Sequence, residues 1–597
     1  APFRRDGLTV IRETASQAYS GGPAVFVLND GALILQGDRR YSYRHRIVRV
    51  LNREGVIAFG EVTVPGGAEI LRLRTIKVDG QIFEPELNHH KATISMPALA
   101  PGDAIELEYV EHAAPDEREQ FELASFDAPI ILSRYSVVAP PEVAVAAVRH
   151  APAPVISAAA DAVLTRTWDL SEVAQAAREV AMPGSGVLPA VVVEPAPDFL
   201  ANGRRDVADA MIAAARPGPR VAALARELHG ADEASTAQRL YTAVMSRVRA
   251  SGHAISGEFA SAEESLERGE GSRAATLLAL ARAAGLHAEL VLAREIDADD
   301  ALASYAHELA VFRFRDGSQW TADLDSTGLP LGSYAPTLAA KVMRIVSVGP
   351  DASEVADAAF AELGPPLREE RSTAEADVRI EPDGTLKASV AIRMSPWRAA
   401  QMRSVLRGLT AAERPKFFQE LAIRLFPGAT HSEGRVEHEN DVNEPLVVRV
   451  ECEAPAWVVF KPGGVDVDQI APGLGLRHIY GRQPSRRYPL AVNTLLFETA
   501  DFRVRLPEGV TFAMPVRRSV QTEFGDYGLE LKQLDSRTWN MRRSFNIRMQ
   551  VVSPERYDGF NQFAANIESI ERRRMSLVGV PAPTSVSRAM PPGANAD

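Results

Sequence analysis

Residues 261–327 read SAEESLERGEGSRAATLLALARAAGLHAELVLAREIDADDALASYAHELAVFRFRDGSQWTADLDST, and this stretch decides the predicted fold. Ser272 opens a segment, residues 272–284, that consists almost entirely of Ala and Leu and predicts a buried helix. A strand over residues 286–295 follows, and two further strands flank the Asp-Gly turn at residues 316–317. A helix packed on an antiparallel sheet makes this part of the chain α+β.

Helix-start signals surround this segment. Ser261 and Glu264 form a predicted capping box, and Gly269 is the expected stop of the short helix between them. A second capping box is predicted upstream, with Ser235 as the N-cap and Gln238 three residues later. We expect residues 196–350, which contain these signals, to be one α+β core domain.

The chain before this core is predicted to be β-rich. In residues 38–65, alternating apolar and polar residues around the Asn-Arg-Glu-Gly sequence at 52–55 indicate a hairpin. A stronger hairpin signal is the Asp-Gly pair at 79–80 between two apolar runs. Many short strands with regular turns favour a β-sandwich-like domain over residues 1–195.

The chain after the core returns to β structure. Over residues 366–580 we expect a β-rich domain that includes a hairpin at Asp383–Gly384, an amphipathic helix in residues 409–428 and a terminal helix in residues 553–577. Residues 581–597 are rich in Pro and Ala without apolar periodicity, and are predicted to be disordered. The fold class is therefore multidomain α+β.

Composition and charge exclude several classes of function. The 597 residues carry a formal charge of −12, so nucleic acid is not an expected partner, because phosphate binding needs a basic face. No apolar run reaches the ~18 residues that span a bilayer. No spacing matches a zinc, calcium or phosphate site, so no cofactor is expected. Cys452 is the one cysteine, lies in an alternating strand pattern and is expected to be buried and unreactive.

Three residues of the opening stretch stand in an order that suggests chemistry. A nucleophile is best placed at a helix N-terminus, where free N–H groups stabilise negative charge. A His must then take its proton, and a third group must orient that His. Ser272 occupies the helix start, His307 opens the later strand, and Asp323 lies on the strand after the turn.

This layout resembles the transglutaminase-like superfamily, within the papain-like cysteine class. The resemblance places the family's Cys at Ser272, its His at His307 in YAHELAV and its Asp at Asp323, with Asp325 as a competitor for the last position. The LAPGDAIELEY stretch looks like the domain of unknown function that precedes such cores in many bacterial exported proteins, and the RYDGFNQFAANIESI stretch looks like its usual C-terminal companion. The resemblance implies a periplasmic or extracellular location.

The departure from the family is the hydroxyl at the nucleophile position. A Ser hydroxyl stays protonated where a Cys is partly thiolate, and a helix dipole worth ~1 kcal/mol does not close that gap. Ser272 is also a good helix N-cap in its own right. Three interpretations stay open at this point: an N-cap without chemistry, a Ser-His-Asp hydrolase, and a relic binding groove.

Three functions follow from these interpretations. The first is a catalytically inactive transglutaminase-like scaffold or binding module, with a protein or glycan partner. The second is an amidase or esterase that uses Ser272, His307 and Asp323 in the same groove. The third is a protein whose outer β domains bind polysaccharide or peptide while the core serves as a spacer.

Overall fold

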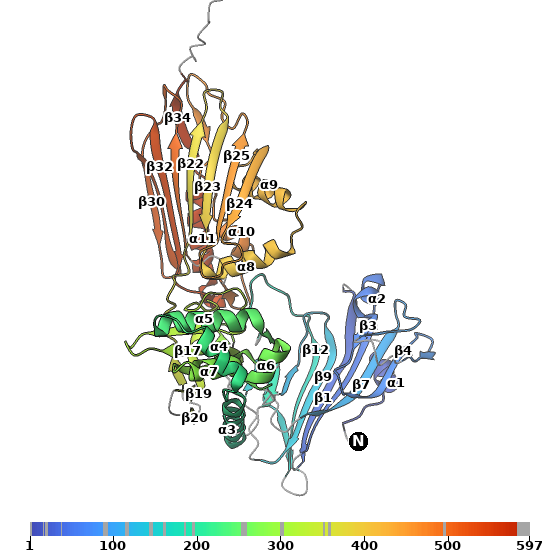
Figure 1. Ribbon diagram of the computed structural model, residues 1–597. Coiled ribbons are helices and arrows are strands. Elements are labelled where there is room, and N and C mark those ends of the chain that lie inside the picture. Colours follow the sequence, from blue (N-terminus) through green and yellow to red (C-terminus); the bar gives the residue numbers. More distant parts are fainter. Residues whose placement is uncertain are drawn as a thin grey trace, which may run out of the picture. The chain divides into compact units, whose positions relative to one another are not determined.

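The chain folds into two compact units, of which the first holds most of residues 1–207 and the second most of residues 208–597 (Figure 1). Helix α3 (Pro197–Ala214) spans the boundary between them. The predicted domain limits at 195, 350 and 366 stay predictions. The computed structural model describes residues 3–15, 17, 22–36, 39–86, 93–113, 119–141, 147–158, 163–183, 187–193, 197–251, 260–298, 304–349, 353–355, 360–492 and 497–581. The predicted disordered tail lies outside these residues from 582 onward.

The first unit is built on an eight-stranded sheet in the order β11-β12-β9-β1-β2-β7-β4-β5. A three-stranded sheet in the order β10-β13-β8 and a β3–β6 pair accompany it. The elements are α1 (Gly7–Glu13), β1 (Ala24–Gln36), β2 (Arg39–Val50), α2 (Arg53–Phe59), β3 (Glu61–Thr63), β4 (Glu69–Ile76), β5 (Ile82–Phe83), β6 (Thr93–Ser95), β7 (Ala104–Ala113), β8 (Glu119–Glu122), β9 (Ile130–Ala139), β10 (Ala147–Arg149), β11 (Val155–Ala158), β12 (Leu164–Val173) and β13 (Ala190–Val193).

One predicted hairpin of the first unit is wrong and another is confirmed. Residues 52–55 do not form a turn between strands, because Asn52 caps α2 by accepting a hydrogen bond from Gly55 N at 3.0 Å. A Cβ at Gly55 would lie 2.0 Å from the carbonyl oxygen of Pro23, so only glycine permits this packing. At residues 79–80 the hairpin forms as predicted between β4 and β5, with Gly80 at φ 90°.

The core of the second unit packs helices on a sheet in the order β18-β17-β16-β19-β20, with β21 paired to β19. Its helices are α4 (Pro219–Glu227), α5 (Glu233–Arg247), α6 (Ala262–Arg268) and α7 (Arg273–Ala283), which Figure 1 shows gathered together. Its strands are β14 (Arg249–Ala250), β15 (Glu270–Gly271), β16 (His287–Glu295), β17 (His307–Arg313), β18 (Gln319–Asp323), β19 (Leu338–Val348), β20 (Ser353–Val355) and β21 (Phe360–Glu362).

Helix α7 is the buried helix that the sequence predicts. Nine of its residues, from Arg273 to Ala281, are buried, and the helix packs against α4, α5, α6 and β16. The predicted capping box at Ser261 and Glu264 is confirmed at the start of α6, and Gly269 ends that helix at φ 69°. The predicted N-cap at Ser235 is wrong: Asp232 caps α5, and Ser235 is the third helical residue of the same capping box.

The rest of the second unit is a large β structure around an eight-stranded sheet in the order β24-β25-β23-β22-β28-β32-β31-β30. Aromatic residues of α11 pack on one of its faces, with Tyr557, Phe560 and Phe563 in its core. The elements are β22 (Ser372–Ile380), β23 (Leu386–Arg393), α8 (Pro396–Gly408), α9 (Arg414–Leu425), β24 (His431–Glu437), β25 (Val447–Ala454), β26 (Val465–Val467), α10 (Leu476–Tyr480), β27 (Leu490–Ala491), β28 (Phe497–Arg505), β29 (Val510–Phe512), β30 (Val516–Gln521), β31 (Gly525–Gln533), β32 (Thr538–Ile547), β33 (Val551–Val552), η3 (Pro554–Arg556), α11 (Tyr557–Glu571) and β34 (Met575–Gly579).

The fold class of a multidomain, β-rich α+β protein is confirmed. The predicted terminal helix is shorter than expected, because residues 575–579 form strand β34 between β26 and β29 instead of a last helical turn. Cys452 is buried on β25, as predicted, and burial raises the pKa of its thiol to about 11.

Candidate functional site

The segment that leads into Ser272, at the N-terminus of α7, is tightly packed. After α6 ends, β15 pairs with β14 in parallel and delivers the chain to the start of α7. Gly271 has φ 151°, and a Cβ there would lie 2.2 Å from Oγ of Ser265. Glycine is therefore required immediately before Ser272 for steric reasons.

The hydroxyl of Ser272 serves as a helix cap. Its Oγ accepts a hydrogen bond from the N–H of Ala275 at 3.0 Å, and its carbonyl oxygen accepts one from Oγ1 of Thr276 at 2.7 Å. The residue is 6% exposed. An N-cap of this kind stabilises a helix by about 1 kcal/mol, and this role needs no chemistry.

His307 and Asp323 form a directly bonded pair. Nε2 of His307 lies 2.8 Å from Oδ1 of Asp323, and Nδ1 of the same ring lies 3.8 Å from Oδ2 of Asp325. Burial alone would lower the pKa of His307, but the hydrogen bond and the charge of Asp323, with smaller contributions from Asp325 and Glu295, raise it above its ordinary value of 6.5.

Asp323 is immobilised by the loop that follows it. Besides the imidazole, its Oδ1 accepts hydrogen bonds from the N–H groups of Asp325 (3.2 Å) and Ser326 (2.8 Å), and its Oδ2 accepts one from the N–H of Ala335 (3.0 Å). The carboxylate is fully buried. A buried carboxylate with four donors keeps its position, so it can orient His307 as the third member of a triad does.

Two buried side chains contact the end of β18, Arg273 from the start of α7 and Tyr241 from α5. Arg273 donates to the carbonyl oxygens of Val248 and Leu324, each at 2.9 Å. Tyr241 donates to the carbonyl oxygens of Asp323 at 3.0 Å and Leu329 at 3.1 Å. The Arg273 contact with Leu324 joins the chain next to Ser272 to the chain next to Asp323. Neither residue stood out in the sequence, since each lies on an apolar helix face without a motif.

The three sequence-predicted positions are thus only partly assembled. The structure joins His307 to Asp323, but in the described part of the chain no hydrogen bond joins Ser272 to His307. Within that same part, no group of three or more His, Cys, Asp and Glu side chains is placed to hold a metal ion. The arrangement supplies a carboxylate-oriented imidazole that can take up a proton, while the hydroxyl of Ser272 is engaged as a helix cap.

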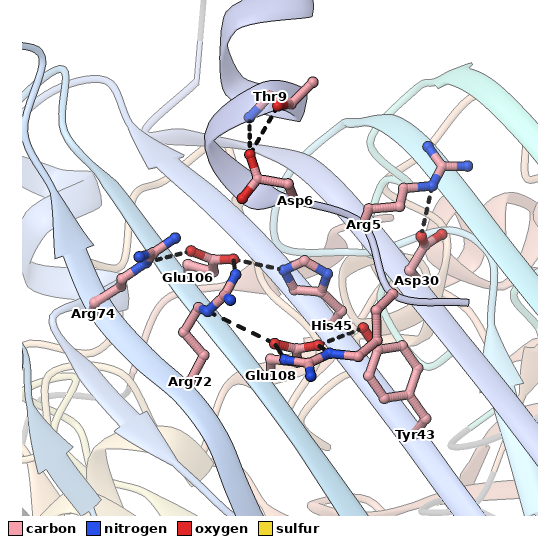
Figure 2. A network of polar contacts seen from close by, with 11 residues as sticks. Arg5, Asp6, Thr9, Asp30, Tyr43, His45, Arg72, Arg74, Glu106 and Glu108 are labelled. Carbon is pink, nitrogen blue, oxygen red and sulfur yellow. Dashed lines mark hydrogen bonds and ion pairs between the residues drawn. The ribbon is translucent and has the colours of Figure 1, made fainter. Parts of the chain in front are cut away.

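A second polar cluster lies on the main sheet of the first unit (Figure 2). Glu106 and Glu108 of β7 are fully buried and face cations from neighbouring strands and from the N-terminal segment. The polar contacts are Arg74–Glu106 at 2.6 Å, Arg72–Glu106 at 3.2 Å, His45–Glu106 at 3.0 Å, Tyr43–Glu108 at 2.9 Å, Arg4–Glu108 at 2.6 Å and Arg5–Asp30 at 3.1 Å.

The register of the sheet explains this cluster. Six strands place one polar residue each side by side in a single row, which runs Asp169, Arg134, Asp30, His45, Glu108 and Arg72. Residues opposite each other on neighbouring strands share a face, so the row forms one continuous polar band. The band buries the carboxylates of Glu106 and Glu108 completely.

Burial and neighbouring charges act in opposite directions on the pKa values of the carboxylates in this cluster. Burial would raise the pKa of Glu106, but hydrogen bonds from His45 and Arg74 and their charges lower it to about 2. Burial raises the pKa of Asp30 to about 6, against the opposing charges of Arg5 and Arg134. Arg4 and Arg5 precede α1, so the cluster anchors the N-terminal segment to the sheet.

Comparison with known proteins gives a fold and one matched region. Residues 470–577 match a family model described as a domain of unknown function with a solved structure, DUF3858. No curated protein matches the sequence. The crystal structure of a protein described as a "putative protease" from Parabacteroides distasonis ATCC 8503 has a similar fold, with a TM-score of 0.59 and 13% sequence identity over 94% of this chain and 99% of that chain. The chain therefore shares its fold, over nearly its whole length, with that protein.

Proposed function

We propose that this protein is a non-catalytic transglutaminase-like protein that acts as a scaffold or binding module. The observation that carries the proposal is the state of Ser272, whose buried hydroxyl caps α7 and has no hydrogen bond to His307 in the described residues. The fold shared with a protein described as a protease supports the kinship. By the family resemblance we also propose a periplasmic or extracellular location.

Physical chemistry favours inactivity at this site. A general base activates a hydroxyl only when it reaches that hydroxyl, and Ser272 lacks this contact with His307. Loss of the nucleophile in a serine protease lowers turnover on the order of 10⁶-fold. The thiol of Cys452 does not replace it, because it lies on β25 and burial raises its pKa to about 11.

A turnover assay tests the proposal. We expect the protein to release no ammonia from glutamine-containing peptides and to cleave no peptide amide above the uncatalysed rate. Ser272→Ala is the matched variant, and its rates are expected to equal those of the wild type. Turnover in the wild type that disappears in Ser272→Ala would overturn the proposal.

Restoring a thiol gives the proposal a positive readout. Ser272→Cys places a thiol at the N-terminus of α7, where His307 activates it only by direct contact. Ser261→Cys is the control, since Ser261 caps α6 in the same way. Because Ser272 has no hydrogen bond to His307 in the described residues, we expect iodoacetamide to modify the two thiols at similar rates below pH 7. Much faster modification of Ser272→Cys that is lost with His307→Ala would contradict the proposal.

A second candidate is an esterase or amidase that uses Ser272, His307 and Asp323. The bonded His307–Asp323 pair favours it, because an oriented imidazole is the general base that such an enzyme needs. This candidate predicts ester hydrolysis that rises with pH through the raised pKa of His307 and is lost in both Ser272→Ala and His307→Ala. A flat, uncatalysed profile in all three proteins excludes it.

For the third function, binding of polysaccharide or peptide by the outer β domains, the exposed aromatic residues give no support in the case of a polysaccharide. Sugar-binding faces use exposed aromatic rings, and among the described residues the exposed aromatic side chains are Phe83 and Phe360. These two lie on β5 and β21, in different units, so they do not form a strip.

A further inference from the structure

An arginine-lined cavity in the second unit has no role in the site around Ser272. It has a volume of about 480 Å³, which is within the range of small-molecule pockets. Four arginines and two glutamates line it, which leaves an excess of two positive charges. The cationic members are Arg368, Arg371, Arg393 and Arg403.

Arg403 of α8 is the fixed centre of this cavity. It is 4% exposed, and its Nη2 donates to the carbonyl oxygens of His438 (3.2 Å), Asp441 (2.7 Å) and Glu444 (2.8 Å). Its Nε is buried and has no hydrogen-bond partner. A buried N–H group without an acceptor lowers the stability of the folded protein. A bound acceptor at Nε of Arg403 would remove this cost.

The other arginines leave most of their charge uncompensated by carboxylates. Arg368 donates to the carbonyl oxygen of Asn443 at 2.6 Å, which is a neutral acceptor. The side chain of Arg393 has no hydrogen-bond or ion-pair partner within the described ranges. Of the four arginines, Arg371 alone pairs with a carboxylate, that of Glu369 at 3.1 Å. Burial lowers the pKa of Arg403, and the nearby charge of Arg368 adds to this effect while Asp441 opposes it.

The remaining wall of the cavity is apolar. Its carbon-rich lining comes from Pro330, Met394, Pro396, Ala399, Val442 and Pro445. A cavity lined by both cationic and apolar side chains fits an amphipathic ligand, whose charged group pairs with guanidinium groups while its body packs on apolar side chains such as Met394. Guanidinium groups pair with carboxylate or phosphate through two parallel hydrogen bonds.

We propose that this cavity binds a small organic anion, with its carboxylate or phosphate group held by Arg368, Arg393 and Arg403 and its apolar body against the proline-lined wall. The cavity does not include Ser272, His307 or Asp323, so the proposal does not depend on whether the protein is an enzyme.

Calorimetric titration of the full chain tests this assignment. The probes are phenyl phosphate and benzoate, which separate the two anionic groups, together with inorganic phosphate and the neutral benzyl alcohol. We expect saturable binding of at least one aromatic anion, tighter than that of inorganic phosphate, and no binding of benzyl alcohol. Binding of inorganic phosphate alone, or of no probe at 10 mM (roughly the weak limit for small ligands), would overturn the proposal.

Variants localise the binding. Arg393→Gln and Arg368→Gln are each expected to weaken the aromatic anion about tenfold, since each removes a charge-assisted contact. Arg424→Gln is the matched control: it removes the same charge from the exposed face of α9, outside the cavity, and is expected to leave affinity unchanged. An equal loss in all three variants would show that the anion responds only to net charge, which contradicts the proposed site. Arg403 is left intact because its carbonyl contacts hold the 438–444 segment.

Discussion

Nε2 of His307 lies 2.8 Å from a carboxylate oxygen of Asp323 that also accepts two backbone N–H groups. The carboxylate of Asp323 is fully buried, whereas the imidazole of His307 is 17% exposed. The imidazole is therefore the member of the pair that solvent can reach. A carboxylate bonded to an imidazole in this way is the arrangement that orients a general base in a catalytic triad. Its electrostatics can be tested without any assumption about a substrate.

Removing the charge of Asp323 should lower the pKa of His307. We expect Asp323→Asn to bring the imidazole pKa down from its raised value, because the hydrogen bond and charge of Asp323 are the main causes that oppose burial. NMR titration of the imidazole protons measures this change. Asp325→Asn is the control and should have a smaller effect, since Asp325 lies 3.8 Å from the ring. An equal fall in the two variants contradicts the dominance of Asp323.

The same pair should make stability depend on pH. The folded pKa of His307 is above its unfolded value, so its stabilising contribution is fully present below about pH 6.5 and is lost as the pH rises through the folded pKa. Denaturant unfolding of wild type and His307→Gln between pH 5 and 9 measures it. The difference in unfolding free energy between the two proteins should shrink as the pH rises; a constant difference would contradict this linkage.

Ser272→Ala should behave as the loss of a helix cap. We expect a destabilisation of about 1 kcal/mol, because the N–H of Ala275 loses its acceptor. Ser261→Ala removes the matching cap of α6 and should cost a similar amount. Thermal and denaturant unfolding compare the two. A gain in stability in Ser272→Ala, as often seen when a strained active-site residue is removed, would favour a catalytic role.

Glu106→Gln should destabilise the first unit at neutral pH. The substitution leaves Arg72, Arg74 and His45 facing a neutral amide in a buried setting, at a cost of about 3 kcal/mol. Because the folded pKa of Glu106 is about 2, below its ordinary 4.5, its contribution is present above pH 4.5 and is lost as the pH falls toward 2.

Denaturant unfolding from pH 3 to 7, followed through the buried Trp168, measures this effect. The difference in unfolding free energy between wild type and Glu106→Gln should shrink as the pH falls from 4.5 to 3. Glu69→Gln, at an exposed position on the neighbouring strand β4, is the control and should follow the wild type throughout. A difference in unfolding free energy that stays constant with pH would mean that the carboxylate of Glu106 is not the cause of the pH dependence.

Cys452 should be unreactive in the folded protein. With its thiol pKa raised to about 11, the thiolate fraction at pH 8 is on the order of 10⁻³, far below that of an ordinary cysteine. Mass spectrometry after iodoacetamide treatment should find no modification in native protein and full modification in denaturant. Rapid native modification at pH 8 would contradict the burial of β25 at this residue.

Local signals predicted the core well because they depend on neighbours in sequence. Ser261, Glu264 and Gly269 define α6 through contacts three or four residues apart, and the Asp-Gly turn at 316–317 joins β17 to β18 as expected. The order of Ser272, His307 and Asp323 was enough to place the last two together. The missing hydroxyl–imidazole contact could not be predicted, since it depends on how α7 sits against the sheet.

Features that depend on distant partners escaped prediction. Helix α2 replaced a hairpin because Gly55 packs against Pro23, which lies thirty-two residues earlier in the sequence. Glu106 and Glu108 are buried by side chains from β2, β4 and the N-terminal segment, which lie far away in the sequence and form no local pattern. Arg403 is buried by carbonyl groups thirty-five or more residues away, and no local motif marks it.

Intact-mass analysis with a fluorophosphonate probe tests the central claim most directly, because the probe attaches only to an activated serine hydroxyl. The account predicts no mass shift in the wild type and none in Ser272→Ala or His307→Ala. A single adduct on Ser272 that requires His307 would contradict it and establish a serine hydrolase.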